Sequence, residues 1–456
     1  MQYNDLKYLA MSLPEDILRE KWSGHFRNAE ALIEKRLSDK NLPYAMRCRL
    51  ELEKNNIKLI KENYTISKEE ALAQIRERIP DFTEAELDEV VLENKADHAY
   101  VEGELKFLHS FCAALFRVYP EIWKRAGNNG TDDYSMLLDF ISDLKDGQDT
   151  VSHIHIRHSL SLRPEAVRKG KTLHVHLPLP CERAGVRNLK ILETVPSPVK
   201  LPEVSEPQPT VYFEEPAAED QTFVVEYAFD HTQRYVDTSK ADLKAIAAAE
   251  IPEEEKQYLA EELPHIQFTP YIRALAEELR AGETNPLLVA RKFYDYITTQ
   301  VEYRFMRDYG SVDNLSEYCA VNRRGDCGVQ ALLFIALCRV SGIPARWESG
   351  LDAKPDDVGE HDWAMFYIPS MGWLHADPSY GGSAHTRGLT KLWNYFFGNV
   401  DPYRVPTNNA LQGEFVPAKK YLRTDPCDNQ DGEAEYDDRR VEAREMICTF
   451  EDKGIK

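Results

Sequence analysis

The chain has no long hydrophobic run and no surplus of positive charge. Its 456 residues contain no apolar stretch near the ~18 residues that cross a membrane. The 77 acidic residues outnumber the 56 Lys and Arg and give a formal net charge of −21. So acidic a chain repels phosphate groups. We therefore expect neither a membrane nor a nucleic acid as a partner.

Paired cysteines are also missing. The eight cysteines are scattered and none forms a C-x-x-C pair, which argues against a zinc ribbon or a disulfide scaffold. Free thiols fit a reducing compartment. The N-terminus lacks the basic stretch followed by an apolar stretch that marks a secretory signal. The expected location is cytoplasmic, with a processed secreted chain as the alternative, and the oligomeric state stays open.

No metal or other cofactor is expected. The nearest approach to a metal site is two H-x-H pairs, His153 with His155 and His174 with His176. Four imidazoles would suit zinc, copper or nickel if the two strands paired in register. The apolar residues between them already explain the alternation, so we expect a solvated strand face.

The length suggests about three domains, and the sequence pattern changes along the chain. Residues 1–130 carry apolar residues three and four apart, including a stripe from Val101 to Leu115, and are expected to form a helical region. Residues 131–149 are acidic and contain turn formers, which predicts a linker.

Beyond the linker the period changes to two. Residues 150–240 contain five strand-like runs, which predict an antiparallel β-sandwich. Residues 266–405 alternate helix and strand and are expected to form a separate core. Residues 406–456 are a polar C-terminal tail with short strand-like runs.

The most informative stretch reads RGDCGVQALLFIALCRVSGIPAR and begins at Arg324. Residues 329–340 are apolar on nearly every face, which predicts a buried helix. Gly342 and Pro344 would end it. Cys327 then lies at or next to the helix N-terminus, where backbone N–H groups and the helix dipole favour the thiolate. A thiolate is the form that nucleophilic catalysis needs.

A hairpin downstream supplies partners for this cysteine. The runs HDWAMFYI and GWLHAD are joined through Pro369-Ser370-Met371, a common loop length for a hairpin. With this loop His361 and Asp377 fall on one face, where the carboxylate can reach the imidazole directly or diagonally. Asp377 would orient the ring while His361 faces the thiol of Cys327. This is the arrangement of nucleophile, base and orienting acid in a catalytic triad.

These motifs closely resemble those of the transglutaminase-like cysteine enzymes. The matching pieces are G-D-C-G, L-C-R-V-S-G-I-P-A-R, H-D-W and W-L-H-A-D-P-S, all within residues 266–405. The resemblance implies that Cys327 is the nucleophile, His361 the general base and acid, and Asp377 its orienter. Many relatives have Ala after the catalytic His, where this chain has Asp362.

The resemblance also implies a papain-like transglutaminase core, with the Cys helix packed on an antiparallel sheet. The expected fold class is therefore α+β and multidomain, with a β-sandwich and a helical N-terminal region preceding this core. DNQDGEAE in the tail resembles the tail of bacterial relatives.

Three further side chains are candidates for the site. A tetrahedral intermediate needs hydrogen-bond donors for its oxyanion. The backbone N–H of Cys327 is one candidate, and Asn322 or Tyr318 could supply a second. Trp363 is either the wall of a substrate groove or a core residue. Asp326 is expected to cap the Cys helix.

The expected function is cysteine-dependent acyl transfer on amide bonds through an acyl-enzyme. Hydrolysis of a peptide or protein substrate, by a peptidase or amidase, is the first hypothesis. An acceptor amine would instead give protein-glutamine transamidation, and the same triad serves both. A non-catalytic binding module on the same fold is a hypothesis of another class. An acyltransferase with a small thioester donor is a narrower one, since arylamine acetyltransferases share this triad order.

Overall fold

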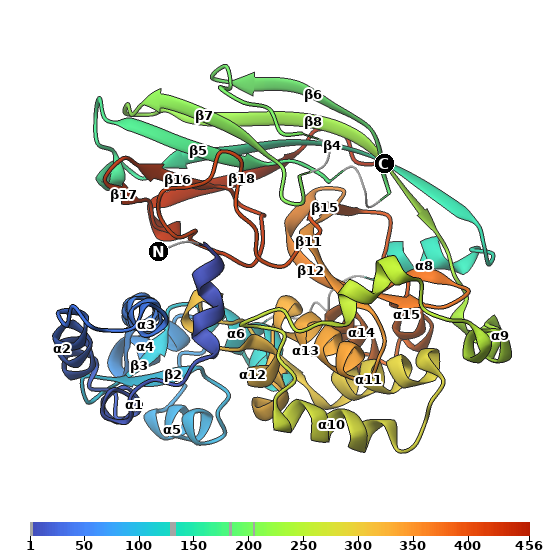
Figure 1. The fold of residues 1–456 in the computed structure, drawn as a ribbon, viewed down its shortest axis with the longest axis horizontal. Helices are drawn as coiled ribbons and strands as arrows, with labels where there is room; N and C mark the ends of the chain where they lie inside the picture. Colours follow the sequence, from blue (N-terminus) through green and yellow to red (C-terminus); the bar gives the residue numbers. More distant parts are fainter. Residues whose placement is uncertain (1–2, 128–133, 182–184, 204–205) are drawn as a thin grey trace.

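The computed structural model describes residues 3–127, 134–181, 185–203 and 206–456. A helical N-terminal region, a β-sandwich and a mixed core occupy separate parts of the molecule (Figure 1). The sandwich lies along one side, and the N-terminal region and the core lie next to each other beneath it. No helix in the described ranges is long and apolar enough to cross a bilayer.

The N-terminal region packs around a hydrophobic cluster of its own. Ser67 and Thr83 cap two of its helices through capping boxes with Glu70 and Glu86. Its elements are η1 (Tyr3–Ala10), α1 (Glu15–Trp22), α2 (Phe26–Leu37), α3 (Tyr44–Asn63), β1 (Tyr64–Ser67), α4 (Lys68–Arg76), α5 (Glu84–Leu92), β2 (His98–Val101), β3 (Glu104–Leu108), α6 (Phe111–Val118) and α7 (Pro120–Arg125).

This region is not wholly helical, because β1, β3 and β2 form a three-stranded sheet. The predicted helical stripe from Val101 to Leu115 is wrong up to Leu108, where β3 ends. The reason is local. Glu102 and Gly103 have φ of 53° and 85°, and two successive positive φ values make a tight hairpin turn.

Two four-stranded antiparallel sheets form the sandwich, in the orders β17-β16-β5-β7 and β18-β4-β8-β6. The five expected strands are present. The tail is not a separate unit, because β16 pairs with β5 and β18 pairs with β4. The elements are β4 (Asp149–Leu162), η2 (Pro164–Ala166), β5 (Thr172–Pro178), β6 (Val186–Val195), β7 (Thr210–Pro216), β8 (Thr222–Arg234), β16 (Glu433–Tyr436), β17 (Arg439–Arg440), η6 (Ala443–Glu445) and β18 (Met446–Asp452).

The core is built around α13 (Cys327–Val340), whose residues from Gly328 to Arg339 are all buried. A five-stranded sheet in the order β14-β13-β12-β11-β15 packs on it. The other elements are η3 (Thr238–Lys240), α9 (Leu243–Ala248), η4 (Glu253–Leu259), α10 (Pro270–Arg280), α11 (Pro286–Gln300), β9 (Glu302–Tyr303), η5 (Tyr309–Ser311), α12 (Leu315–Asn322), β10 (Arg324–Gly325), β11 (Ala345–Lys354), β12 (Asp357–Ile368), β13 (Gly372–Ala376), α14 (Pro378–Thr386), α15 (Thr390–Tyr395), β14 (Phe397–Gly398) and β15 (Arg404–Asn408).

The expected linker at 131–149 contains a helix, α8 (Ser135–Ser142). Leu137 and Ile141 of α8 are buried in the same hydrophobic cluster as α13. Two apolar residues four apart bury one face of a short helix, which the acidic neighbours obscured in the sequence. Residues 131–133 of this stretch lie outside the described residues.

The N-terminal region contacts the segment that precedes the Cys helix. Arg49 on α3 is buried and lies 3.1 Å from Asp313 Oδ2. The Asn63 amide at the end of α3 donates to Asp308 Oδ2 (2.8 Å). These contacts place the N-terminal helices against the 308–313 segment, which includes Tyr309 of the candidate site.

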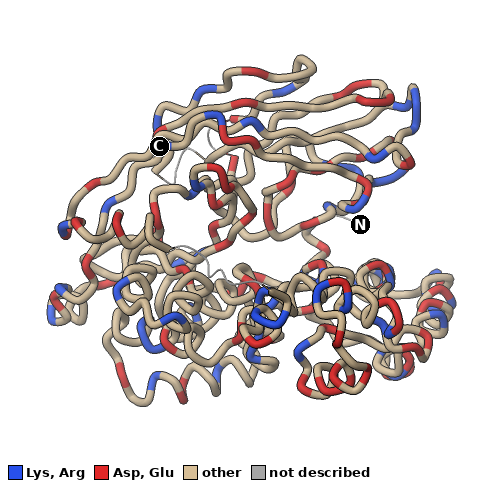
Figure 2. The backbone as a smooth tube through the Cα atoms, turned by 180° about the vertical axis from the view of Figure 1, so that it is seen from behind, with Lys and Arg blue, Asp and Glu red and all other residues tan. Residues whose placement is uncertain are grey.

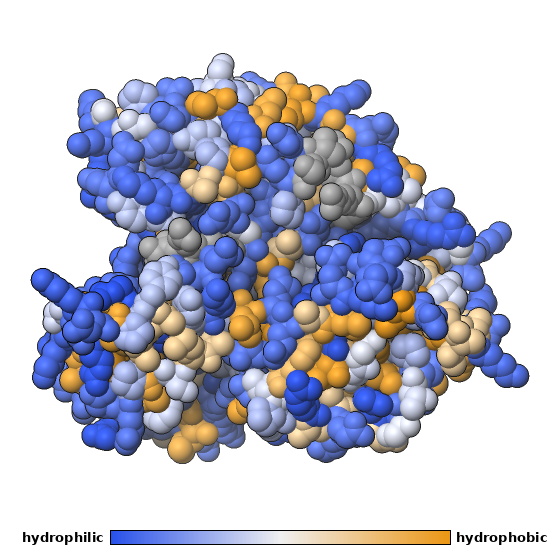
Figure 3. Space-filling model, viewed as in Figure 1, coloured by the Kyte–Doolittle hydropathy of each residue, from blue (hydrophilic) through white to orange (hydrophobic). Residues whose placement is uncertain are grey.

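Acidic residues are spread over all parts of the molecule (Figure 2), whereas hydrophobic side chains gather in patches (Figure 3). Acidic residues occur throughout the chain, including loops where the sandwich meets the core (Figure 2). The face shown in Figure 3 is mostly hydrophilic, with hydrophobic patches mainly in its lower half. The high negative charge is therefore a property of the whole surface rather than of one tail.

Candidate active site

Cys327 begins α13 and is crowded by polar side chains. Asp326 caps the helix, as expected, by accepting a backbone N–H of the first turn (3.2 Å). A Cβ added at Gly328 would lie 2.3 Å from Tyr309 Oη and 2.5 Å from Asp362 Oδ2. Glycine after the cysteine therefore lets both groups approach the start of the helix.

The hairpin of β12 and β13 brings His361 to Asp377. Ala364 lies opposite Ala376 in the register, so Asp377, the next residue, is diagonal to His361. His361 Nε2 lies 2.8 Å from Asp377 Oδ2, and both residues are buried. The contact expected between the imidazole and the carboxylate is present.

Aromatic rings fix the orientation of His361. Its ring lies edge-on to Tyr380, with centroids 5.0 Å apart, and stacks on Trp363 at 6.1 Å. Because Nε2 faces Asp377, Nδ1 is the nitrogen left to accept a proton from a thiol. This hydrogen bond places the ring proton on Nε2.

Asp377 is fully buried and held on both oxygens. Its Oδ1 accepts the Ser379 hydroxyl (3.0 Å) and the backbone N–H of Tyr380 (2.9 Å). Its Oδ2 faces His361 and Arg404, whose Nη2 lies 3.0 Å away. Burial opposes ionisation, but His361 and Arg404 outweigh it and hold the pKa of Asp377 well below its usual range. The ionised carboxylate is suited to stabilise an imidazolium.

The thiol of Cys327 faces Asp362 instead of His361. It donates to Asp362 Oδ2 with an Sγ–O distance of 3.5 Å. Over the described ranges, no hydrogen bond joins Cys327 to His361. Burial raises the pKa of the Cys327 thiol well above its usual value, and Asp362 and Asp326 raise it further. The expectation that the helix N-terminus favours the thiolate is therefore wrong for this conformation, because burial and two acids outweigh the dipole.

Asp362 is an unusual carboxyl group, because it is buried beside other acids. Burial raises its pKa well above the usual range, and Asp326 and Asp425 add to the effect. Its second oxygen accepts a hydrogen bond from Gln430 Nε2 (2.8 Å). The carboxyl group of Asp362 therefore holds the Cys327 thiol in its protonated form.

Replacing Asp362 with asparagine should make Cys327 more reactive toward iodoacetamide at pH 7.5. The change removes an acid that holds the thiol protonated, and a fall of one pKa unit multiplies the thiolate fraction by about ten. The rate is read cysteine by cysteine by mass spectrometry over a pH series. Asp357→Asn, at an exposed position on the same strand, should leave the rate unchanged. An unaltered Cys327 rate in Asp362→Asn would contradict this account.

The three further candidates are placed differently. Asn322 is exposed at the end of α12, and its amide donates to the Tyr318 carbonyl (2.8 Å). The Tyr318 hydroxyl is buried and has no hydrogen-bond partner among the residues described. Trp363 is fully buried and donates its indole N–H to Glu348. Trp363 therefore packs in the core and does not form the wall of a substrate groove.

Sequence reasoning missed two residues that contact this site. Arg404 on β15 supports Asp377, and Gln430 in the tail supports Asp362. Arg404 stands in no motif, so no local signal marks it. Gln430 lies in the DNQDGEAE run, but nothing in that run indicates a contact with Asp362. Asp362 was visible as a departure from relatives with Ala, but its contact with the thiol was not.

The two H-x-H pairs do not meet, because β4 and β5 belong to different sheets. His153 and His155 on β4 contact Asp230 (3.1 Å) and Glu226 (2.8 Å) instead. Within the described ranges, no group of three or more His, Cys, Asp or Glu is arranged to hold a metal ion.

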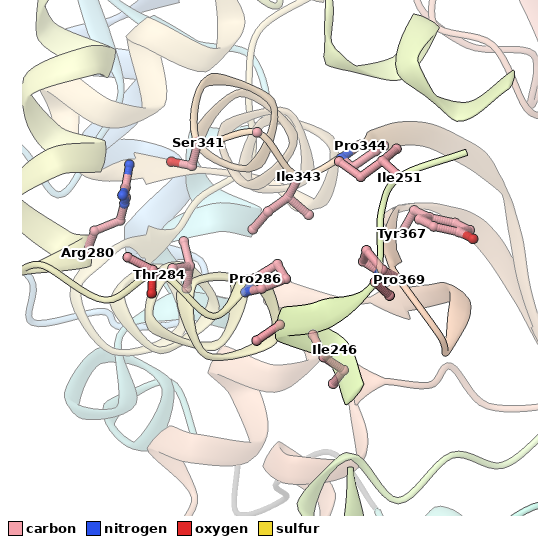
Figure 4. A pocket seen from close by; sticks show the side chains of 14 residues that line it. Ile246, Ile251, Arg280, Thr284, Pro286, Ser341, Ile343, Pro344, Tyr367 and Pro369 are labelled. Atoms are coloured by element: carbon pink, nitrogen blue, oxygen red, sulfur yellow. The ribbon is translucent and has the colours of Figure 1, made fainter. Parts of the chain in front are cut away.

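A cavity of about 340 Å³ lies at the far end of α13. Ile246, Ile343 and Pro369 are among the side chains that line it (Figure 4). A helix of 14 residues is about 20 Å long, so this cavity is remote from Cys327 and does not belong to the candidate active site.

Comparison with known proteins identifies the core. Residues 273–378 match the family model of the transglutaminase-like superfamily. The chain is 29% identical over 122 residues to protein-glutamine gamma-glutamyltransferase of Pseudomonas aeruginosa, covering 24% of this chain and 18% of that protein. It is 24% identical over 186 residues to an uncharacterized protein of Haemophilus influenzae, covering 34% of this chain and 50% of that protein. The chain thus spans at most half the length of these relatives.

Two solved structures are also similar. One is described as a "Putative Cysteine Protease" from Cytophaga hutchinsonii, with 16% identity, a TM-score of 0.40 and coverage of 68% of this chain and 89% of that chain. The other is the periplasmic domain of TgpA from Pseudomonas aeruginosa, with 15% identity, a TM-score of 0.29 and coverage of 55% and 99%. From the family match, residues 273–378 of this chain form a domain of the transglutaminase-like superfamily.

Proposed function

We propose that the chain catalyses acyl transfer on amide bonds, with Cys327 as nucleophile, His361 as base and acid, and Asp377 as the group that orients His361. The observation that carries the proposal is the buried contact of 2.8 Å between His361 Nε2 and Asp377 Oδ2. It is found in the same domain as a cysteine at the start of a buried helix.

The chemistry follows from the atoms available. His361 Nδ1 takes the thiol proton, and the thiolate of Cys327 attacks the amide carbonyl. Backbone N–H groups of the first turn of α13 are suited to stabilise the oxyanion. The imidazolium then protonates the leaving amine, the C–N bond breaks, and an acyl-enzyme forms. Water, deprotonated by His361, hydrolyses the thioester and restores the thiol.

This reaction requires a change at the thiol. Because Cys327 donates to Asp362 in the structure, its side chain must turn from Asp362 to His361 before attack. Rotation about one side-chain bond is a small motion. Substrate binding that favours the His361 contact would then generate the thiolate only when an amide is present.

Hydrolysis is the first candidate, and transamidation is the second. The second is favoured by the name of one relative, a protein-glutamine gamma-glutamyltransferase. An acceptor amine would then take the place of water at the thioester. The two outcomes share the acyl-enzyme and differ only in the second half-reaction.

The test is a screen of peptide amides, with and without an added primary amine, read by intact-protein mass spectrometry. We expect an acyl adduct on Cys327, released as acid in water and as a substituted amide with the amine. Cys327→Ser should abolish both adduct and product. Cys112→Ser, at a partly exposed cysteine on α6, should change neither. Release of acid alone would select hydrolysis. Ligand binding without any adduct would support the binding module instead.

A further inference from the structure

A second cavity, of about 250 Å³, lies where the C-terminal tail returns to the sandwich beside β12. This volume equals the share of about eight water molecules in the liquid. The acidic side chains that line it are those of Glu360, Asp425, Asp428, Asp431 and Glu433. Glu360 and Asp431 are exposed and Asp428 is buried, so the acids extend from the surface into the interior.

The cations beside this cavity are already engaged. Lys419 Nζ lies 2.5 Å and Arg423 Nε 2.8 Å from carboxylate oxygens of Glu433. Within the described ranges, no ion pair reaches Asp425 or Asp428. The cavity therefore has more acidic groups than cations.

Two acceptors that line the cavity receive no hydrogen bond from the described residues. Asp428 is 7% exposed, and among the residues described no hydrogen bond or ion pair involves its carboxylate. Asn429 is 2% exposed, and its Nδ2 donates to the carbonyls of Pro209 and Thr407 (3.2 Å each). Its Oδ1 has no partner in the described part of the chain. Such groups are normally satisfied, and here they suit a ligand that brings N–H donors and a positive charge.

The pKa values of these acids also suit a positively charged ligand. Burial raises the pKa of Asp428 well above its usual range, and Asp425 and Asp362 add to the shift. Burial also raises the pKa of Asp425 to about 6. A bound cation would favour the ionised carboxylates and so gain the attraction of the whole group.

The cavity is two hydrogen bonds from the candidate nucleophile. Gln430 lines the cavity and donates to Asp362 Oδ1 (2.8 Å), while Asp362 Oδ2 accepts the Cys327 thiol (3.5 Å). One residue of extended chain spans at most ~3.6 Å. A basic side chain in the cavity would therefore belong to the residue that reacts or to one close to it.

We propose that this cavity binds a protonated basic group, an alkylammonium or a guanidinium, carried by the molecule that Cys327 attacks. The inference rests on the proposed acyl transfer and adds a substrate class to it. An organic cation is favoured over a metal ion because no described group of three acids is arranged to coordinate one.

The bound group is recognised and does not react. Carboxylates stabilise the charged form of an amine, and a protonated amine has no lone pair with which to attack a thioester. The cavity therefore selects a basic side chain near the reactive amide, and it is distinct from any site for an acceptor amine.

The test is isothermal titration calorimetry with the full chain carrying Cys327→Ser. Because this substitution removes the nucleophile, binding is measured without catalysis. The probes are N-acetyl-argininamide and N-acetyl-citrullinamide, which have nearly the same shape but differ in charge. We expect the arginine probe to bind at least tenfold more tightly, and Asp428→Asn to remove that preference. Asp143→Asn, at an exposed acid outside the cavity, should leave it unchanged.

Equal binding of both probes, or a preference that survives Asp428→Asn, would overturn the proposal. If Asp428→Asn does not fold, Glu360→Gln carries the test, because Glu360 lies at the exposed end of the cavity. A loss of at least threefold in the arginine preference supports the site, and no loss overturns it. Arginine-selective binding without acyl-enzyme formation in the unsubstituted chain would refute the proposed function but leave the cation site standing.

Discussion

Replacing His361 with glutamine should lower kcat/KM for acyl transfer by about 10³–10⁴-fold. Glutamine keeps an N–H donor that can face Asp377, but it cannot accept a proton from a thiol at neutral pH. The loss is expected to be large because burial and the acids around Cys327 disfavour the thiolate. Without a base, attack would depend on the small thiolate fraction that forms unaided. The measurement is the second-order rate constant of acyl-enzyme formation at peptide amide concentrations well below KM, read by mass spectrometry.

His385→Gln is the matched control. His385 is exposed on α14, the helix that Asp377 begins, and its ring contacts Trp393. His385 lies on the helix that follows Asp377 but not in the candidate active site. Its substitution should therefore leave kcat/KM within about twofold. Comparable losses in both variants would point to damage of α14 rather than to a base, and full activity in His361→Gln would exclude His361 from the proton transfer.

The pair His361 and Asp377 could be predicted because its determinants are local. A three-residue loop sets the register of one hairpin, and a period of two then places both side chains on one face. The buried helix after Cys327 could be predicted equally well, because its apolar residues leave no solvated face. In both cases the relevant contacts connect residues close in sequence.

The ionisation of Cys327 could not be predicted in this way. The helix N-terminus is a local feature and favours the thiolate. Burial, Asp362 and Asp326 act in the opposite direction. Their weight depends on how β12 packs against α13, which the sequence does not show.

The role of the tail was also hidden. Strand β18 was recognisable as a short extended run, whereas β16 lies in a stretch that reads as polar. Their partners β4 and β5 lie far away in sequence. Strand pairing over such distances depends on tertiary packing as much as on local propensity. The acidic cavity is formed where the tail returns toward β12, so it could not be predicted from the sequence either.

Replacing Arg404 with methionine should reduce the free energy of unfolding of the core by about 3–5 kcal/mol. Arg404 is fully buried, and its Nη2 lies 2.7 Å from Asp401 and 3.0 Å from Asp377. Methionine fills similar volume but leaves two buried carboxylates without their cation. The measurement is the urea midpoint of the core transition at pH 7, followed by aromatic fluorescence.

Arg36→Met is the control, because Arg36 pairs with Asp16 at 2.7 Å at the surface. Exposed pairs contribute about 0–1 kcal/mol, so its midpoint should hardly move. The double variant Arg404→Met with Asp401→Asn should recover part of the loss, since it removes one unpaired charge. Equal midpoints for Arg404→Met and Arg36→Met would show that Arg404 does not support the site.

The pH dependence gives an independent check on Arg404. The pKa of Asp377 is depressed in the folded protein, so the stability from its ionised form is present above the unfolded value of about 3.9. It is lost as the pH falls below that value toward the folded pKa. Without Arg404 the Asp377 carboxylate takes up a proton more readily, which reduces the cost of burying it at low pH. The difference in the free energy of unfolding between the unsubstituted chain and Arg404→Met should therefore decrease steadily from pH 7 to pH 4. A difference that stays constant over this range would mean that the variant loses packing and not a charge interaction.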